Sequence, residues 1–375
     1  MQGHTGTDHV MMARALRLAE RGAWTTRPNP MVGCVLARGD EVVGEGWHRR
    51  QGGPHAEVVA IEAAGERARG ATAYVSLEPC AHTGRTGPCA DALIAAGVTR
   101  VVAAMRDPFP QVDGSGFDRL RAAGIEVAHG LMEADAQALN RGYVSRLVRG
   151  RPWLRVKLAM SLDGHTALES GESKWISGEA SRRDVMRWRA RAGALLTGSG
   201  TIMADDPQLT VRLDEDAEFV PPLRVVLDPG LATIARGRVR EGDAPTLYVH
   251  AANAKPPREL GSERVAVPAT GNALDLAAVL RMLADRGINE VQVEAGATLA
   301  GAFMRAGLVD EVLLYVAPVL LGAQARPLFA GLQVHDMAQR MRLRVVDSVS
   351  VGEDLRLRLV PEASGMDADA AGGAG

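Results

Sequence analysis

Two stretches decide the fold of the first part of this chain: residues 54–58, PHAEV, and residues 77–89, LEPCAHTGRTGPC. Together they supply one imidazole, from His55, and two thiols, from Cys80 and Cys89. An imidazole with two thiolates is a ligand set that suits zinc, and three protein ligands leave one tetrahedral position open for water. The pattern therefore predicts a catalytic metal site.

Glu57 follows His55 by two residues and is not needed as a ligand. A bound zinc would lower the pKa of its water from ~15.7 to ~7, and a carboxylate at this position could shuttle protons. An H-x-E motif followed by P-C-x-x-C is the signature of zinc-dependent nucleobase deaminases. The motif therefore predicts hydrolytic deamination, with Glu57 as the catalytic acid and base.

The spacing of the cysteines departs from that signature, because eight residues rather than two separate Cys80 from Cys89. A loop with Gly and Pro can bring two thiolates to one ion at either spacing. The longer loop makes His82 an alternative ligand, which leaves a closed structural zinc site open as a second interpretation. We favour Cys89 as the third ligand. Cys34 lies in an apolar run and is expected in the core.

Length and composition limit the class of protein. A chain of 375 residues with 46% hydrophobic content exceeds what one core usually covers, so two domains are expected. Three cysteines argue against a disulfide framework and favour a reducing compartment. No secretory segment and no apolar run of ~18 residues is present, which predicts a cytoplasmic protein. A net charge of −2 and 4% aromatic residues favour a small-molecule substrate over nucleic acid.

Residues 1–147 are expected to form the first domain. Helical and strand patterns alternate along it, which predicts a three-layer α/β domain with a mixed sheet. A helix that includes residues 11–19 opens it, and Asp8 is the expected cap. The other predicted elements are strands at 32–37, 41–48, 71–79 and 99–105 and helices at 54–64 and 89–96.

Asn29 and His48 are further candidates in this domain. Two prolines flank Asn29, and a rigidly held amide can offer a heterocycle both a donor and an acceptor. An Asn in a proline turn with no ligand is an equally good interpretation from the residues alone. A lone His such as His48 is more often a satisfied structural group than a substrate contact.

A second domain is expected over residues 152–361, followed by a disordered tail at 362–375. It opens with a strand that carries Lys157. Residues 198–207 are expected to be a loop, and residues 291–307 a strand, a turn and a helix. Glycine-rich turns before a helix suit a dinucleotide pyrophosphate. Neither turn is G-x-G-x-x-G, so a Rossmann domain is not supported.

Both halves together resemble a known family. The motifs at 25–35, 54–58 and 77–98, then at 157–177, 201–212 and 293–304, look like the bifunctional deaminase/reductase of bacterial riboflavin biosynthesis. The resemblance covers residues 8–360 and includes the eight-residue cysteine spacing. It implies a cytidine-deaminase-like three-layer α/β/α domain followed by a dihydrofolate-reductase-like α/β domain.

The same resemblance implies two reactions. The first domain would deaminate 2,5-diamino-6-(5-phosphoribosylamino)pyrimidin-4-one, and the second would use NADPH to reduce the ribosyl side chain of 5-amino-6-(5-phosphoribosylamino)uracil to ribityl. One zinc ion, NADPH, phosphorylated pyrimidine substrates and a homo-oligomer are expected, with no nucleic acid or membrane partner. The rival classes are a nucleoside or tRNA deaminase with an appended module, and a zinc-binding module without activity.

Residue by residue, the resemblance implies the following roles. The catalytic residues would be Glu57, Lys157 and Glu294. The substrate contacts would be Asn29, His48, His82, Ser173, Arg189, Leu209, Arg212 and Glu294. The residues that line the cofactor would be Ala159, Trp175, Thr201, Asp205, Gly296, Ala297, Thr298, Leu299, Ala300, Gly301 and Ala302. The family often has proline at the position of Ala297, which affects only the stiffness of the turn.

Overall fold

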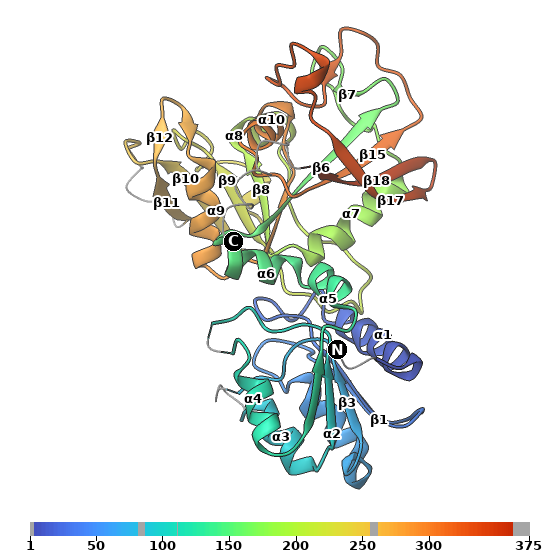
Figure 1. Cartoon of the computed structure of the whole chain (residues 1–375). Coiled ribbons are helices and arrows are strands. Elements are labelled where there is room, and N and C mark those ends of the chain that lie inside the picture. The colour runs from blue at the N-terminus through green and yellow to red at the C-terminus, as the bar shows by residue number, and fades with distance from the viewer. Residues whose placement is uncertain (1–3, 82–86, 111, 256–261, 363–375) are drawn as a thin grey trace. The chain divides into compact units, whose positions relative to one another are not determined.

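A computed structural model describes residues 4–81, 87–110, 112–255 and 262–362 (Figure 1). It divides into two compact units, Met1–Arg151 with Glu218–Val220, and Pro152–Ala217 with Pro221–Gly375. The return of the short segment Glu218–Val220 to the first unit was not expected from the sequence. The tail expected from residue 362 onward lies outside the described residues except for Glu362.

The described strands of the first unit form one five-stranded sheet. β1 pairs antiparallel with both β2 and β3, whereas β3, β4 and β5 are parallel. The sheet is therefore mixed, as the sequence predicts. In sheet order the strands are β2 (Glu41–Trp47), β1 (Gly33–Arg38), β3 (Thr72–Val75), β4 (Arg100–Ala103) and β5 (Glu126–His129).

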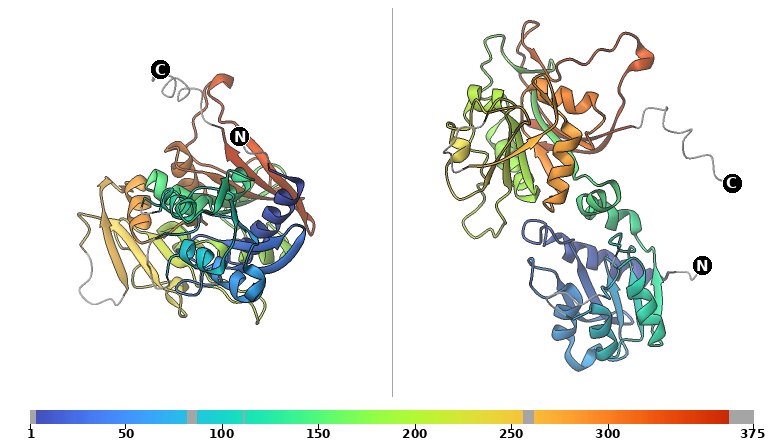
Figure 2. Two further views of the ribbon diagram at one scale, coloured as in Figure 1. Left: turned by 60° about the horizontal axis from the view of Figure 1, so that its bottom comes forward. Right: turned by 90° about the vertical axis from the view of Figure 1, so that its left-hand side faces the viewer.

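Helices cover both faces of this sheet, as Figure 1 and Figure 2 show. Apolar side chains of α2, α3 and α4 pack in the core on one face, and those of α1 and α5 pack in the core on the other. The three-layer α/β/α fold expected from the sequence is confirmed, and Cys34 is fully buried in the first core. The helices are α1 (Gly6–Glu20), α2 (Ala56–Ala64), η1 (Gly65–Ala68), α3 (Cys89–Ala96), α4 (Ser115–Ala122), α5 (Glu133–Leu139) and α6 (Arg141–Arg149).

Two glycines of β2 allow α2 to lie directly on the sheet. A Cβ atom at Gly44 would stand 2.3 Å from the Ala60 carbonyl oxygen, and one at Gly46 would stand 2.6 Å from that of Ala56. Both distances are shorter than real Cβ contacts, so only glycine fits at these positions. The backbone at the start of α2, between His55 and Glu57, is thereby fixed against β2.

The cap of α1 differs from the prediction. Thr5 is the N-cap residue, and its hydroxyl accepts from the backbone N–H of Asp8. Asp8 in turn accepts from the backbone N–H of Thr5, so the two form a capping box. Asp8 is the third helical residue rather than the cap, because the helix begins earlier than the apolar positions indicate.

The second unit contains a nine-stranded sheet within the described residues. Its strands are parallel from β11 to β15, and β18 and β17 continue it antiparallel. In sheet order they are β11 (Glu263–Val267), β10 (Thr246–Ala251), β9 (Leu223–Leu227), β8 (Ala194–Gly198), β14 (Glu290–Val293), β6 (Trp153–Ser161), β15 (Glu311–Ala317), β18 (Asp354–Pro361) and β17 (Leu343–Val351). Two short ribbons pair β12 (Ala269–Thr270) with β13 (Ala273–Leu274), and β16 (Arg326–Pro327) with β7 (His165–Ala167).

Helices also lie on both faces of this sheet. Apolar side chains of α9 and α10 pack in the larger core on one face. Those of α7 and α8 pack in two smaller cores on the other face. The prediction of a loop at residues 198–207 is wrong, because α8 occupies most of this segment. The helices are α7 (Glu179–Arg191), α8 (Ser199–Asp205), η2 (Arg238–Arg240), α9 (Leu276–Asp285), α10 (Ala297–Arg305) and η3 (Met337–Gln339).

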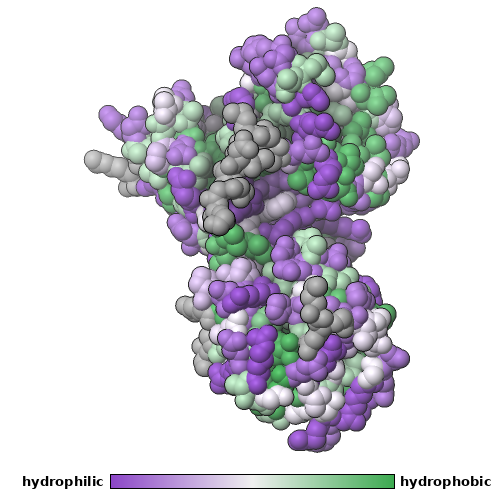
Figure 3. Space-filling view, viewed as in Figure 1, coloured by the Kyte–Doolittle hydropathy of each residue, from purple (hydrophilic) through white to green (hydrophobic). Residues whose placement is uncertain are grey.

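The surface carries no continuous apolar band in the view of Figure 3, where polar and apolar residues are interspersed. In the described part of the chain, no helix combines the length and the apolar character that a membrane crossing requires.

Candidate active sites

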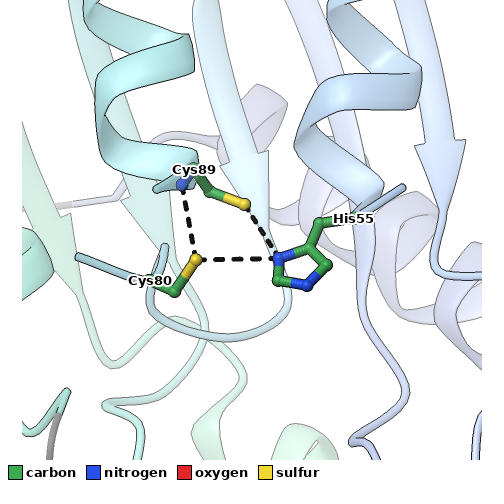
Figure 4. Close-up of side chains that lie close together, drawn as sticks. All are labelled: His55, Cys80 and Cys89. Carbon is green, nitrogen blue, oxygen red and sulfur yellow. Dashed lines mark hydrogen bonds between the residues drawn. The ribbon is translucent and has the colours of Figure 1, made fainter. Parts of the chain in front are cut away.

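Three side chains that are separated in the sequence converge in the first unit (Figure 4). His55 is the N-cap residue of α2, Cys89 is the first residue of α3, and Cys80 lies in the segment that follows β3. The His55 Nδ1 atom lies 3.1 Å from the Cys89 sulfur and 3.6 Å from the Cys80 sulfur. The His55 side chain makes no capping hydrogen bond to α2, so its ring is available to the cluster.

The cluster fits a zinc ion. All three potential ligand atoms lie within 4.8 Å of one another. A tetrahedral zinc with a nitrogen bond of ~2.0 Å and a sulfur bond of ~2.3 Å keeps those two atoms about 3.5 Å apart. The His55–Cys80 separation is within about 0.1 Å of this value, and the His55–Cys89 separation needs a shift of about 0.4 Å. His82, the alternative ligand, lies outside the described residues.

The two thiols affect each other's ionisation. Hydrogen bonds from Cys89 and from the His55 ring hold the pKa of Cys80 below its usual range, although burial opposes this. The backbone N–H of Cys89 also donates to the Cys80 sulfur, at 3.3 Å. Beside that thiolate the pKa of Cys89 is raised, by its hydrogen bond to Cys80 and by burial. Zinc binds cysteines as thiolates, so metal binding at this pair would release the protons that the thiols hold.

Glu57 is buried beside the cluster, with only 3% of the residue exposed. Burial raises the pKa of its carboxyl group to about 7, and the charge of Cys80 adds to this effect. A carboxyl group with a pKa near neutrality can both accept and donate a proton. The geometry therefore gives Glu57 the properties of a general acid and base.

One supporting residue of this site was missed from the sequence. Glu78 is buried, and its carboxylate accepts from the backbone N–H groups of Asp107, Gly114 and Gly116 at 3.0–3.2 Å. These bonds tie the segment before Cys80 to the start of α4. A charged residue directly before the Pro-Cys dipeptide, at the end of an apolar strand, was the signal that could have indicated it.

Asn29 and His48 lie together in the same unit. The Asn29 Nδ2 atom is 3.1 Å from the His48 Nε2 atom, and the His48 Nδ1 atom is 3.0 Å from the Pro54 carbonyl oxygen. The His48 ring meets the His55 ring edge to face, with centroids 5.4 Å apart. Burial lowers the pKa of His48. The structure thus brings both predicted residues to the metal cluster.

The second unit brings together Lys157, Arg189 and Glu294. Lys157 lies on β6 and Glu294 directly follows the neighbouring parallel strand β14. Arg189 on α7 forms a two-pronged ion pair with Glu294, with both N–O distances 2.7 Å, and donates to the Thr210 carbonyl oxygen at 2.8 Å. Gln292 donates to the same carboxylate at 2.9 Å. Gln292 was missed from the sequence, although a polar residue inside the apolar strand, on the same face as Glu294, is a readable signal.

The charges of this group depend on one another. Burial raises the pKa of Glu294, but Arg189, Lys157 and Gln292 lower it to about 2. Burial lowers the pKa of Lys157, and the neighbouring Glu294 charge opposes this. The Lys157 ammonium group also lies over the ring of Tyr315, 5.7 Å from its centroid. Glu294 is therefore a carboxylate, and Lys157 is an amine that releases its proton more readily than a surface lysine.

The remaining predicted residues of this unit lie on several elements and differ in exposure. Ala159 is on β6, Thr201 and Asp205 are on α8, and Gly296 is the N-cap residue of α10. Ser173 is partly buried, Arg212 is exposed, and Leu209 is 3% exposed. Trp175 is 71% exposed and Arg182 stacks on its ring. Ala297, Thr298, Leu299 and Ala302 lie in the first two turns of α10, where Ala300 and Gly301 face the core.

Comparison with known proteins gives the family. Residues 5–105 match the zinc-binding region of cytidine and deoxycytidylate deaminases, and residues 152–357 match the RibD C-terminal domain. Riboflavin biosynthesis protein RibD of Escherichia coli is 47% identical over 363 residues, which cover 94% of this chain and 99% of that protein. RibD of Haemophilus influenzae is 44% identical, over 95% of this chain and 98% of that protein.

Solved structures are similar over nearly the whole chain. Acinetobacter baumannii RibD superposes with a TM-score of 0.87 at 44% identity, and covers 95% of this chain and 99% of its own. A Thermotoga maritima diaminohydroxyphosphoribosylaminopyrimidine deaminase/5-amino-6-(5-phosphoribosylamino)uracil reductase superposes with a TM-score of 0.84 at 33% identity, with the same coverage. The two domains follow in the expected order, and the three side chains that could hold zinc lie together. The chain therefore belongs to the RibD family, the bifunctional deaminase/reductase enzymes of riboflavin biosynthesis.

Proposed function

We propose that the first unit deaminates 2,5-diamino-6-(5-phosphoribosylamino)pyrimidin-4-one, and that the second unit reduces the resulting 5-amino-6-(5-phosphoribosylamino)uracil with NADPH. The convergence of His55, Cys80 and Cys89 beside a buried Glu57 is the observation that carries the proposal. The Thermotoga maritima relative, matched over 99% of its length, supports the choice of substrate. NADPH rests on the resemblance of the second unit to the family reductases.

His55, Cys80 and Cys89 would hold the zinc ion. When bound, zinc acts as a Lewis acid that lowers the pKa of a water molecule and makes it a nucleophile at neutral pH. The protein itself moves the protons. Glu57 takes a proton from the attacking water and delivers it to the ring nitrogen beside the carbon under attack.

Glu57 then acts a second time. It takes the proton of the new hydroxyl group and passes it to the amino nitrogen, so the carbon–nitrogen bond breaks, ammonia leaves and a carbonyl group remains. A pKa of about 7 suits both directions of transfer. Asn29 is the substrate contact that we place beside this chemistry, since its amide can pair with the polar edge of the pyrimidine.

In the second unit, reduction needs a hydride at ribose C1′ of the opened imine and a proton at the imine nitrogen. Bound NADPH supplies the hydride. Lys157 supplies the proton, because burial has lowered the pKa of its ammonium group. Glu294 is held by Arg189 and Gln292 and orients the substrate, and the exposed Arg212 suits its phosphate.

The cofactor site is assigned to the ends of β8 and β14. These strands are parallel neighbours; α8 follows β8 directly, and α10 follows β14 after a short connection. Backbone N–H groups at the start of α10, after Gly296, can bind a pyrophosphate. Ser173 and Leu209 are assigned to the substrate, and Ala159, Trp175, Thr201 and Asp205 to the cofactor.

Two further properties belong to the proposal. A reducing, cytoplasmic environment suits a protein in which the three cysteines are free and two of them are proposed metal ligands. A homo-oligomer is supported by the outer strand β17, where Val345 is 54% exposed and Val349 is 40% exposed. Light scattering on the purified protein tests the oligomeric state.

Mass spectrometry tests the two reactions. Zinc-loaded protein is incubated with the diaminopyrimidine ribosyl phosphate, with and without NADPH. Exchange of an amino group for oxygen without NADPH, and the further gain of two hydrogens with it, is the expected result. Folded, metal-bound protein that changes the substrate in neither reaction contradicts the proposal.

A further inference from the structure

The amide of Asn29 can present either its oxygen end or its nitrogen end to a ligand. Its backbone is fixed, because the Asn29 N–H donates to the Thr26 carbonyl oxygen at 3.0 Å. Met31, two residues after Asn29, is held by Asn140. The Asn140 side chain accepts from the Met31 N–H at 2.8 Å and donates to the Met31 carbonyl oxygen at 2.9 Å. Asn140 is buried, so this clamp is shielded from water. The oxygen and nitrogen ends of a carboxamide are nearly equal in shape, and only a hydrogen-bond partner distinguishes them.

His48 is that partner. The Pro54 carbonyl oxygen can only accept, so the Nδ1 atom of His48 carries the hydrogen of the ring. In a neutral imidazole the other nitrogen, Nε2, is then an acceptor. A donor must face it, and the Asn29 Nδ2 atom does so at 3.1 Å. Among the described residues, no protein group donates to the Asn29 Oδ1 atom.

We propose that His48 is a positioning residue that fixes the orientation of the Asn29 amide through the chain Pro54–His48–Asn29, and does not bind the substrate itself. The Asn29 oxygen is then always the end that is offered to the ligand. The site consequently selects a heterocycle that presents an N–H group, from an amino or lactam nitrogen, at that point. This inference rests on the proposed deamination, since it names how the same site recognises its pyrimidine.

The chemistry of His48 favours positioning over direct contact. Each of its two ring nitrogens already has a protein partner, so the ring has no polar atom left for a ligand. The residue is 3% exposed. The His48 ring also packs against the ring of the proposed ligand His55. His48 therefore lies between the Asn29 amide and the proposed metal ligands.

A double-mutant cycle tests the proposal on the full chain. Wild type, N29A, H48F and the double variant are compared for deaminase kcat and KM, zinc content and reductase rate. H48F is expected to lower deaminase kcat/KM by about tenfold, the value of one hydrogen bond of ~1.4 kcal/mol. The loss should appear mainly in KM, because an amide that is free to turn weakens substrate and transition state alike. In the N29A background, H48F should cause no further loss.

A second variant, His48→Gln, is needed in case H48F loses zinc. His48→Gln retains an acceptor oxygen near the position of Nε2 and is expected to keep kcat/KM within about threefold of wild type. Additive losses in the cycle, or a zinc-loaded His48→Gln variant as impaired as N29A, would overturn the proposal. A wild-type protein that does not deaminate the diaminopyrimidine refutes the proposed function instead, so the two failures are distinct.

Discussion

The glycine at position 46 should be required for the deaminase site although it touches neither metal nor substrate. In Gly46→Ala, the new Cβ atom would stand 2.6 Å from the Ala56 carbonyl oxygen and 2.7 Å from the Ala60 nitrogen. Ordinary contact begins at 3.4 Å, so the start of α2 must retreat by about 0.8 Å. Ala56 lies between His55 and Glu57, and the displacement therefore falls on the proposed ligand and the proposed proton carrier together.

The size of the effect follows from that displacement. A misplacement of about 1 Å in catalytic geometry can cost ~100-fold in rate, and overpacking a close contact typically costs ~1–3 kcal/mol of stability. We expect deaminase kcat/KM to fall by about 10- to 100-fold. The reductase activity of the same chain should stay near wild type, because Gly46 lies in the other unit.

Steady-state assays of both activities, zinc analysis and thermal unfolding measure this outcome. Gly6→Ala is the matched control in the same unit, since a Cβ at Gly6 meets nothing within 4 Å. If Gly46→Ala keeps deaminase kcat/KM and unfolding temperature at the values of Gly6→Ala, the close contact between β2 and α2 does not position His55 and Glu57.

Four further results are expected. Glu57→Gln should lower deaminase kcat by ~100- to 10,000-fold with zinc retained. The control Glu62→Gln changes an exposed residue of the same helix and should leave kcat unchanged, and a rate near wild type for Glu57→Gln would contradict the role of Glu57. Removal of the metal with a chelator should abolish deamination and leave reduction intact, as measured by NADPH oxidation with the deaminated pyrimidine; parallel loss of both would contradict this. Glu294→Gln should lower the reductase rate by about tenfold or more and leave the deaminase unchanged, and equal losses would indicate a global defect. Hydrogen bonds from Arg100 hold the pKa of Asp8 well below its usual range, so Asp8→Asn should lower the free energy of unfolding at pH 7. A carboxyl group whose pKa is depressed by folding stabilises the folded state at pH values above its unfolded pKa of ~3.9. The difference in unfolding free energy between wild type and Asp8→Asn should therefore shrink below ~pH 4 in urea titrations, and a constant difference would contradict this.

The local elements of the deaminase unit could be predicted well from the sequence. The helix from Cys89 to Ala96 ends before Gly97, which adopts a positive φ of 73° as a glycine cap does. His55 and Glu57 lie at the start of a helix, as the apolar pattern after them predicts. These features depend on residues close together in the chain, so local propensity determines them.

Features that depend on distant residues could not be predicted. Asn140 clamps Met31 across 109 positions, and nothing near either residue indicates the pairing. The helix at Ser199–Asp205 is only seven residues long and begins with small residues, so it has no apolar period to reveal it. The ion pair between Arg189 and Glu294 also joins residues far apart, and the family resemblance assigned both to the substrate without indicating that they bind each other.

One isotope experiment tests most directly that this single chain hydrolyses an amino group and then transfers a hydride. The diaminopyrimidine ribosyl phosphate is incubated with zinc-loaded protein in ¹⁸O-labelled water, with NADPH dideuterated at nicotinamide C4. We expect a final product with one ¹⁸O in a pyrimidine ring carbonyl and one deuterium at C1′ of the ribityl chain. A product without ¹⁸O would contradict hydrolysis at the zinc site, and a product with ¹⁸O but without deuterium would contradict hydride transfer from NADPH.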